Sequence, residues 1–233
     1  MVARGIDERD GYRGYRTHLV QELQAKGIRD PAVLRAIGQV PRHLFVPESV
    51  RHRAYEDSAL PIGAGQTISQ PWVQARYLEL ARPSTQDKVL EVGTGSGYQT
   101  ALLALLAGQV FSVERIPALA AVARQILAEA GVRNVTVLVG DGSLGWRACA
   151  PFDAILVAAA APEIPAPLVA QLAPEGRLII PLGDRSAQTL TLVTRHEEGI
   201  RTERLSDVRF VPLVGQHGFA DESPRPTEPG WNY

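Results

Sequence analysis

One stretch of this chain, KVLEVGTGSGYQTALLALLAGQVFSVER over residues 88–115, constrains the fold more than any other. Residues 89–92 form a short apolar run that predicts a buried strand. Residues 98–107 are apolar, are rich in good helix formers and stop at a glycine, and residues 110–113 predict a second strand. Strand, glycine turn, helix and strand in this order are typical of one half of a dinucleotide-type α/β fold.

The turn between the first strand and the helix carries Gly93, Gly95 and Gly97. Glycines allow a sharp turn and a close approach of a ligand, because no Cβ blocks the backbone. The free N–H groups at the start of the helix point toward such a ligand. Glu114 ends the second strand about 20 residues after the first glycine, where a carboxylate binds a ribose diol. The turn therefore predicts a nucleoside-binding site, with a purely structural turn as the alternative.

The spacing of the glycines leaves two cofactors open. An NAD-type fingerprint needs a glycine at position 98, where this chain has Tyr98. This disfavours a bound pyrophosphate without excluding it, and S-adenosylmethionine, a nucleoside without phosphates, fits at least as well. The residues alone do not decide between the two.

The rest of the chain continues the alternation of helix and strand. Helices are expected at residues 17–26, from Pro31, and at 71–81, 116–130 and 164–172; strands are expected at 135–139, 153–157 and 177–181, with an antiparallel pair at 188–194 and 208–214. The pattern predicts an α/β fold with a doubly wound parallel sheet. Residues 216–233 are rich in Pro, Gly and charge, and we expect a tail without an element of its own, with Phe219 and Trp231 as candidates for docking.

Composition excludes several classes of function. The net charge of −1 gives no electrostatic footprint for nucleic acid. The N-terminus is charged and no apolar run approaches the length of a membrane span, so we expect neither a signal peptide nor a membrane segment. The single cysteine, Cys149, excludes an internal disulfide and fits the cytoplasm. No pair of histidines has metal-ligand spacing, which disfavours a zinc site.

Two further positions are candidates for the site. Ser69 closes the unusual run LPIGAGQTIS and precedes Pro71, which opens a helix. A serine there fits the helix N-cap, and local sequence favours this structural role. Asp141 ends a strand on the ligand side of an open sheet, where it could contact the adenine or act only as a turn residue.

Many segments of the chain resemble protein-L-isoaspartate O-methyltransferases. The matching pieces are VPRHLFVPE (40–48), AYED (54–57), LPIGAGQTISQP (60–71), VLEVGTGSGYQT (89–100), VERIP (113–117), GDG (140–142), PFDAILV (151–157), APEIP (161–165), GRLIIPLG (176–183) and VRFVPLVG (208–215). They cover residues 15–215 in the family's order. The glycine turn alone indicates any class I methyltransferase, whereas QTIS, PRHLFVP and RFVPLVG are specific to this family.

The resemblance implies a Rossmann-like class I methyltransferase sheet of about seven strands, mostly parallel, with an antiparallel C-terminal strand and N-terminal helical additions. It implies one methyltransferase domain over 1–215, with a helical and substrate-loop region at 1–80, a core at 81–215 and a tail at 216–233. The implied activity is methyl transfer from S-adenosyl-L-methionine to the free α-carboxylate of L-isoaspartyl residues in damaged proteins and peptides, and we expect a monomer. S-adenosyl-L-homocysteine would be the product.

The resemblance also assigns residues. Ser69 matches the active-site serine. The expected cofactor contacts are Gln66, Thr67, Ile68, Gln74, Glu91, Gly93, Thr94, Gly95, Gly97, Glu114, Arg115, Asp141 and Gly142. The expected peptide contacts are Pro61, Ile62, Arg209 and Val211, and no metal is expected.

The chain departs from the family pattern at two places. Trp72-Val73 stands where relatives often carry His or Tyr followed by Met, and the tail is longer than the pattern requires. Three other functions stay open: a related carboxylate methyltransferase with a dedicated peptide substrate, an NAD-dependent oxidoreductase, and an inactive cofactor-binding module.

Overall fold

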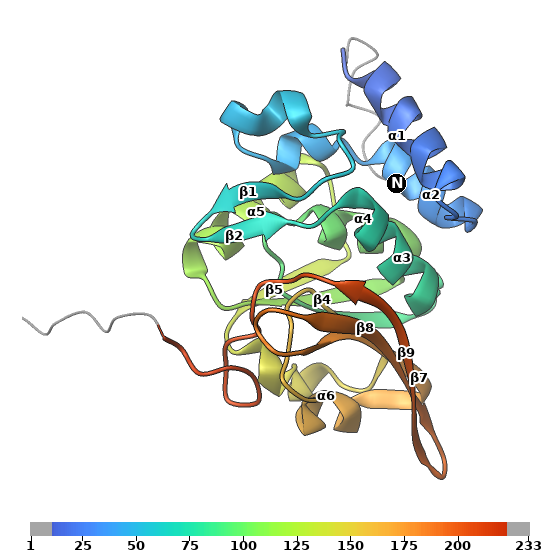
Figure 1. Ribbon diagram of the computed structural model, residues 1–233, viewed down its shortest axis with the longest axis vertical. Coiled ribbons are helices and arrows are strands. Elements are labelled where there is room, and N and C mark those ends of the chain that lie inside the picture. Colours follow the sequence, from blue (N-terminus) through green and yellow to red (C-terminus); the bar gives the residue numbers. More distant parts are fainter. Residues whose placement is uncertain (1–10, 223–233) are drawn as a thin grey trace, which may run out of the picture.

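The computed structural model describes residues 11–222. Its centre is a seven-stranded sheet in the order β5-β4-β3-β6-β7-β8-β9 (Figure 1). The strands are β3 (Lys88–Val92), β4 (Gln109–Glu114), β5 (Val135–Val139), β6 (Phe152–Val157), β7 (Leu172–Gly183), β8 (Gln188–His196) and β9 (Gly199–Val208). Pairing is parallel from β5 to β7 and antiparallel on both sides of β8. The expected doubly wound methyltransferase-type sheet is thus confirmed.

Alternating side chains of the central strands enter two separate hydrophobic cores. Ala154 and Leu156 of β6 belong to the core on one face, and Ile155 and Val157 belong to the core on the other. A parallel sheet buried on both faces needs such continuous apolar runs. The apolar runs that predicted strands in the sequence are therefore explained by the burial of both faces of the sheet.

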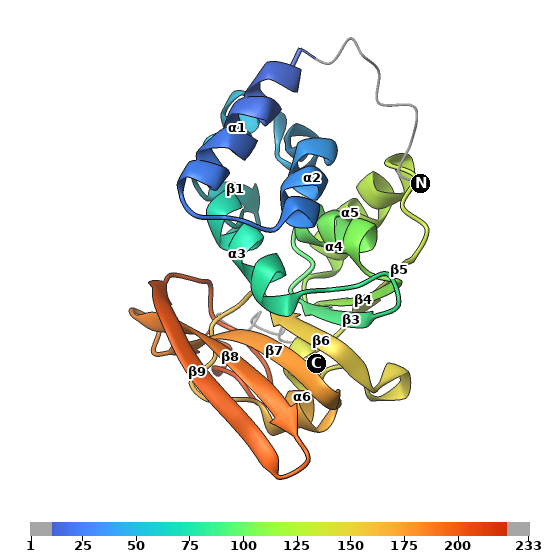
Figure 2. The same cartoon turned by 90° about the vertical axis from the view of Figure 1, so that its right-hand side faces the viewer.

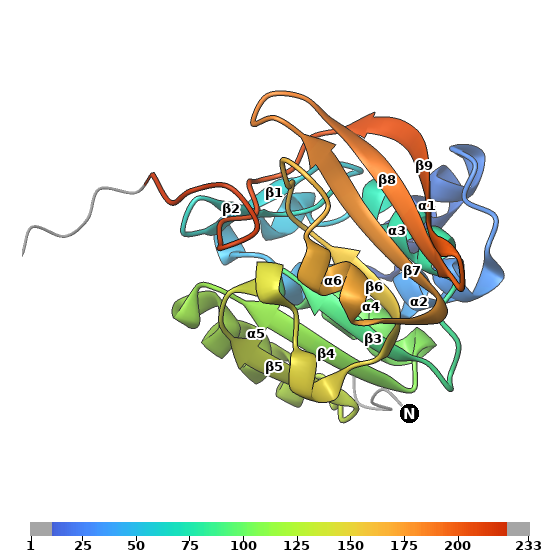
Figure 3. The same cartoon turned by 90° about the horizontal axis from the view of Figure 1, so that it is seen from below.

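The two faces of the sheet are covered by different numbers of helices. The helices are α1 (Arg13–Ala25), α2 (Pro31–Gln39), α3 (Pro71–Ala81), α4 (Tyr98–Leu106), α5 (Pro117–Glu129) and α6 (Ala166–Ala170). Buried residues of α1 to α5 share one core, whereas α6 packs in the other. In Figure 2, α1 and α2 lie above α3 and α4, away from the sheet, and Figure 3 shows α6 in front of β6 and β7.

A separate hairpin lies beside the edge of the sheet that carries the glycine turn. It consists of β1 (Leu60–Gly63) and β2 (Gln66–Ile68), paired antiparallel. The δ-carbon of Ile62 lies 3.4 Å from the position that a Cβ on Gly95 would occupy, so the hairpin packs directly against the glycine turn. The expected substrate-loop run LPIGAGQTIS is this hairpin.

Three expected element boundaries were wrong. The final antiparallel strand spans residues 199–208, and the expected strand at 208–214 instead forms only isolated bridges. Residues 199–208 include several charged side chains, and an edge strand exposed to solvent tolerates charge on most positions. The strand expected at 177–181 is longer than predicted, because β7 covers Leu172–Gly183. The helix expected at 164–172 is shorter than predicted, because α6 covers only Ala166–Ala170 and Leu172 already belongs to β7.

The expectation that Ser69 caps α3 was also wrong. Gln70 is the N-cap residue of α3, and it makes no capping hydrogen bond with its side chain. In the tail, the expected docking of Phe219 is confirmed: it pairs with Val214, and the Arg185 guanidinium lies 4.9 Å from the centre of its ring. Trp231 lies outside the described residues.

Candidate functional site

The glycine turn has the backbone conformation that its sequence demands. Gly93, Gly95 and Gly97 all have positive φ angles, of +94°, +53° and +87°. Only glycine adopts these conformations at low cost. Gly93 also faces Ala158 on β6's continuation, where an added Cβ would lie 3.4 Å from the Ala158 side chain. The turn thus brings bare backbone to the carboxyl ends of β3 and β6.

A carboxylate at the end of β4 fastens the turn. Glu114 accepts a hydrogen bond from the N–H of Gly95 at 2.8 Å and another from the N–H of Ile116 at 2.9 Å. Its side chain is almost fully buried and lines the cavity above the turn. An ionised carboxylate has about four acceptor positions, so hydroxyl groups of a ligand can share it with these amides.

A second acid lies beneath the turn. Glu91 is fully buried, and one of its oxygens accepts hydrogen bonds from Thr100 at 2.5 Å and Ser112 at 2.7 Å. The Ser112 hydroxyl in turn lies 2.5 Å from the hydroxyl of Thr94 in the turn. Burial raises the pKa of Glu91 to about 7. Glu91 therefore supports the turn from below.

A cavity opens above the turn, between the hairpin and the C-terminal segment. It brings together ten of the expected cofactor residues, namely Gln66, Thr67, Ile68, Gln74, Gly93, Thr94, Gly95, Glu114, Arg115 and Gly142. Ser69 and Val211 line it as well. The apolar part of its wall includes Val113, Ile116 and Leu213. We refer to this space as the turn cavity.

A neighbouring cavity shares part of its wall, Ser69 included, with the turn cavity. It is lined by Ala59, Gln70, Trp72, Val73, Asp207, Val208, Arg209 and Phe210, and by residues that also line the turn cavity: Thr67, Ser69, Ala158, Arg185 and Val211. We refer to it as the side cavity. Ser69 therefore stands at the junction of two spaces, one beside the glycine turn and one beside the final strand.

Several expected site residues lie outside both cavities. Glu91 and Gly97 lie below the turn, and a Cβ on Gly97 would lie 3.3 Å from Ala123 of α5. Pro61 and Ile62 belong to the hairpin but line neither cavity. Their roles as direct contacts of cofactor or peptide stay predictions.

The side chain of Asp141 makes several hydrogen bonds within the protein. It accepts hydrogen bonds from the N–H and hydroxyl of Ser143 at 2.8 and 2.7 Å, and from the N–H of Gln216 at 2.7 Å. Partial burial alone would raise the pKa of Asp141, but these hydrogen bonds outweigh it and lower the pKa. Asp141 does not line the turn cavity, so its carboxylate fastens the C-terminal segment beside the neighbouring Gly142.

Other lining residues were not anticipated. Arg185 lines both cavities and forms an ion pair with Glu222 at 3.2 Å. Arg115 pairs with Asp221 at 3.4 Å, and both acids line the turn cavity. Arg185 comes shortly after β7, on the ligand side of the sheet, which is a sequence signal that could have found it. The tail acids carry no comparable signal.

Two features are absent from the described part of the chain. Over residues 11–222, no helix combines the length and the apolar character that crossing a membrane requires. Nor do His, Cys, Asp and Glu side chains gather there in a group of three or more suited to a metal ion.

Comparisons with known proteins agree with this geometry. The family model for protein-L-isoaspartate(D-aspartate) O-methyltransferase matches residues 14–218. A protein-L-isoaspartate O-methyltransferase of Methanospirillum hungatei is 50% identical over 86% of this chain and 93% of the relative. A protein-L-isoaspartate O-methyltransferase of Pseudomonas paraeruginosa is 54% identical over 85% of this chain and 95% of the relative.

Solved structures give the same result. A protein-L-isoaspartate O-methyltransferase is similar with a TM-score of 0.80 and 27% identity, over 87% of this chain and 67% of that one. A protein-L-isoaspartate O-methyltransferase (PCMT) structure from Plasmodium falciparum, solved in complex with S-adenosyl-L-homocysteine, has a TM-score of 0.76 and 29% identity. The similarity covers 85% of this chain and 98% of that one. The chain belongs to the protein-L-isoaspartate(D-aspartate) O-methyltransferase family.

Proposed function

We propose that this protein is a repair methyltransferase that transfers the methyl group of S-adenosyl-L-methionine to the free α-carboxylate of L-isoaspartyl residues in damaged proteins and peptides. The observation that carries the proposal is the position of Ser69 at the junction of the turn cavity and the side cavity. One cavity has the lining that a nucleoside donor requires, and the other opens beside it for an acceptor. Residues 1–215 act as one domain in this proposal.

The turn cavity fits S-adenosyl-L-methionine by its chemistry. The bare backbone of Gly93 and Gly95 leaves room for a close approach, and the start of α4 offers free N–H groups. Glu114 supplies acceptors for ribose hydroxyls, and Ile116 and Leu213 supply apolar walls for the base. Gln66, Thr67, Ile68, Gln74, Thr94, Arg115 and Gly142 complete the proposed cofactor contacts.

The cofactor supplies a methyl group on a positively charged sulfur, which accepts a nucleophile without prior activation. The carboxylate of the acceptor is already ionised at neutral pH, so the chain needs no general base. The Ser69 hydroxyl donates a hydrogen bond that orients this carboxylate toward the turn cavity. The surrounding walls exclude water, which favours a reaction that annihilates opposite charges. The contribution of the protein is alignment.

The side cavity is the proposed peptide site. Arg209 and Val211 line it, and Arg185 adds a second guanidinium near Ser69. Trp72 and Val73 also line the side cavity and do not line the turn cavity. The departure of Trp72-Val73 from the family pattern therefore bears on the peptide side chains next to the isoaspartate, and less on how the cofactor is covered.

The test is methyl transfer from labelled S-adenosyl-L-methionine to two synthetic peptides that differ only in L-isoaspartate or L-aspartate at one position. Base-labile label on the isoaspartyl peptide alone is the expected result. No label on either peptide, with cofactor binding intact by calorimetry, would contradict the proposal and favour a dedicated substrate or an inactive binding module. A third peptide with D-aspartate at the same position measures whether the activity extends to D-aspartyl residues.

Three expectations about the protein's surroundings stay predictions. We expect a monomer, localisation in the cytoplasm and no affinity for nucleic acid. Size-exclusion chromatography with light scattering and a gel-shift assay with mixed-sequence nucleic acid test the first and the third.

A further inference from the structure

The segment that carries Ser69 lacks the local support that helix starts normally have. Pro71 is the first residue of α3, and the N-cap residue Gln70 makes no side-chain capping bond. The first free N–H of the helix, that of Trp72, would then be unsatisfied, which would destabilise the start of the helix. The structure meets this need from elsewhere in the chain.

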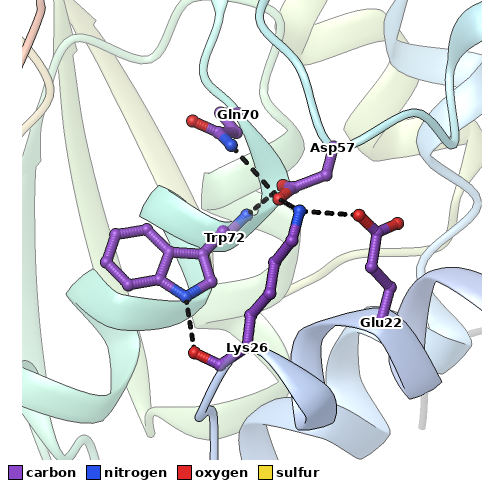
Figure 4. A network of polar contacts seen from close by, with 5 residues as sticks. All are labelled: Glu22, Lys26, Asp57, Gln70 and Trp72. Carbon is purple, nitrogen blue, oxygen red and sulfur yellow. Dashed lines mark hydrogen bonds and ion pairs between the residues drawn. The ribbon is translucent and has the colours of Figure 1, made fainter.

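Asp57 supplies the missing cap from a distance (Figure 4). One carboxylate oxygen accepts the N–H of Trp72 at 2.8 Å, and the other accepts the side-chain amide of Gln70 at 3.1 Å. The carboxylate thus grips the chain on both sides of Pro71, directly after Ser69. Its side chain is 3% exposed, and Lys26 balances its charge at 2.6 Å from the outer side, beside Glu22.

Arg42 holds the same segment from within the protein. Its guanidinium is fully buried, and it donates to the backbone oxygen of Ser69 and to the side-chain oxygen of Gln74, both at 2.8 Å. It also lies 4.9 Å from the centre of the Tyr98 ring. Although burial lowers the pKa of Arg42 to about 10, the group stays charged at neutral pH. A planar fork that joins two acceptors fixes distance and direction together.

We propose that Arg42 and Asp57 are positioning residues for methyl transfer, and that together they set where the Ser69 hydroxyl stands between the two cavities. The inference rests on the proposed function, since it assigns these residues through Ser69. Because capping is supplied by Asp57, the Ser69 side chain is not committed to the helix and can serve the acceptor. Because Arg42 joins Ser69 to Gln74, the serine and one wall of the turn cavity are held as one unit.

The alternative is that the two charges only stabilise the fold. A double-mutant cycle separates the two roles, since residues that act through one group are not additive with its removal. Asp57→Ala is expected to lower kcat on the isoaspartyl peptide about tenfold in the otherwise native enzyme, as misplacement of an orienting group does. In the Ser69→Ala background the same substitution is expected to change kcat by no more than about twofold. The same loss in both backgrounds, or no loss in either, would overturn the proposal.

Further measurements fix the meaning of the cycle. Glu22→Gln, which alters only the exposed partner of Lys26, is the matched control and should leave kcat within about twofold. Calorimetry with S-adenosyl-L-homocysteine should give a Kd within about threefold of native for Asp57→Ala, since Asp57 does not line the turn cavity. If Asp57→Ala does not fold, Arg42→Lys, which keeps the charge but loses the fork, enters the same cycle with the same criteria for kcat.

One measurement needs no variant. α5 also begins with a proline, Pro117, after an N-cap residue without a side-chain cap, so the exposed Ala118 occupies the position of Trp72. Amide exchange should be at least about tenfold slower at Trp72 than at Ala118, and equal rates would overturn the proposed hold of Asp57 on the Trp72 amide.

Failure of this inference can be distinguished from failure of the proposed function. A native enzyme that labels neither peptide would count against the proposed function, whereas an active native enzyme with an additive cycle would count only against the roles of Arg42 and Asp57.

Discussion

The glycine turn at residues 93–97 and the serine segment at residues 69–72 both contribute to the wall of the turn cavity, and they are built in different ways. The turn takes its shape from residue types, because its three glycines adopt positive φ angles that other residues avoid. The serine segment has no such residues and is held by the charged side chains of Arg42 and Asp57. The first kind of support is visible in the sequence, and the second becomes visible only in the folded protein.

The largest expected effect tests the support beneath the turn. Because burial raises the pKa of Glu91 from 4.5 to about 7, the folded state keeps a proton that the unfolded state has lost between these values. Stability should therefore fall as pH rises from about 4.5 to about 7, by about 3 kcal/mol in all. Glu91→Gln, which cannot ionise, should abolish this dependence.

Urea unfolding of both proteins at pH 5 and pH 8 measures the effect. The variant should gain stability relative to the native protein as the pH rises. An equal difference at the two pH values would show that Glu91 is ionised throughout and that the turn rests on a charged group.

The next effect tests residue type in the turn. Gly97→Ala should lower the free energy of unfolding by about 1–2 kcal/mol, because its φ of +87° strains any residue with a Cβ and because that Cβ would press on Ala123. Gly14→Ala is the matched control. Gly14 is an exposed position of α1 with nothing near its missing Cβ, so alanine there should stabilise by about 0.5–1 kcal/mol. If Gly97→Ala were as harmless as the control, the turn would not owe its shape to glycine.

The smallest effect concerns Glu114, the carboxylate that we propose joins the turn to the cofactor. Glu114→Ala should raise the KM for S-adenosyl-L-methionine about tenfold, the scale of one charged hydrogen bond. Steady-state kinetics with the isoaspartyl peptide gives this value, and Glu129→Ala on the outer face of α5 should leave it unchanged. An unchanged KM in folded Glu114→Ala would remove the proposed ribose contact.

The sequence was sufficient where a conformation or a burial pattern is written into successive residues. The strands at 89–92 and 110–113, the glycine turn and the helix from Pro71 follow from apolar runs, glycines and proline. It misled where tertiary contact overrides local preference. Ser69 matched an N-cap, but Asp57 performs that function, and the charged strand at 199–208 is stable because it pairs with β8 on an exposed edge.

The same limit applies to the site. The residues that line the turn cavity follow closely the resemblance to the family, but Arg42 and Asp57 could not be identified as partners of Ser69 from spacing. They lie 27 and 12 positions before it, in segments that match the family but carry no sign of a contact with Ser69. Arg185 meets Glu222, and Arg115 meets Asp221, only because the chain after β9 returns to the carboxyl ends of the strands.

The measurement that tests the account most directly compares binding with chemistry in Ser69→Ala. Isothermal titration with S-adenosyl-L-homocysteine should give a Kd within about threefold of native, because the glycine turn and Glu114 are untouched. The kcat on the isoaspartyl peptide should fall about 10- to 1,000-fold, because one well-placed hydrogen bond to the accepting carboxylate is lost. A native kcat in the folded variant would contradict the proposed role of Ser69 at the junction of the two cavities.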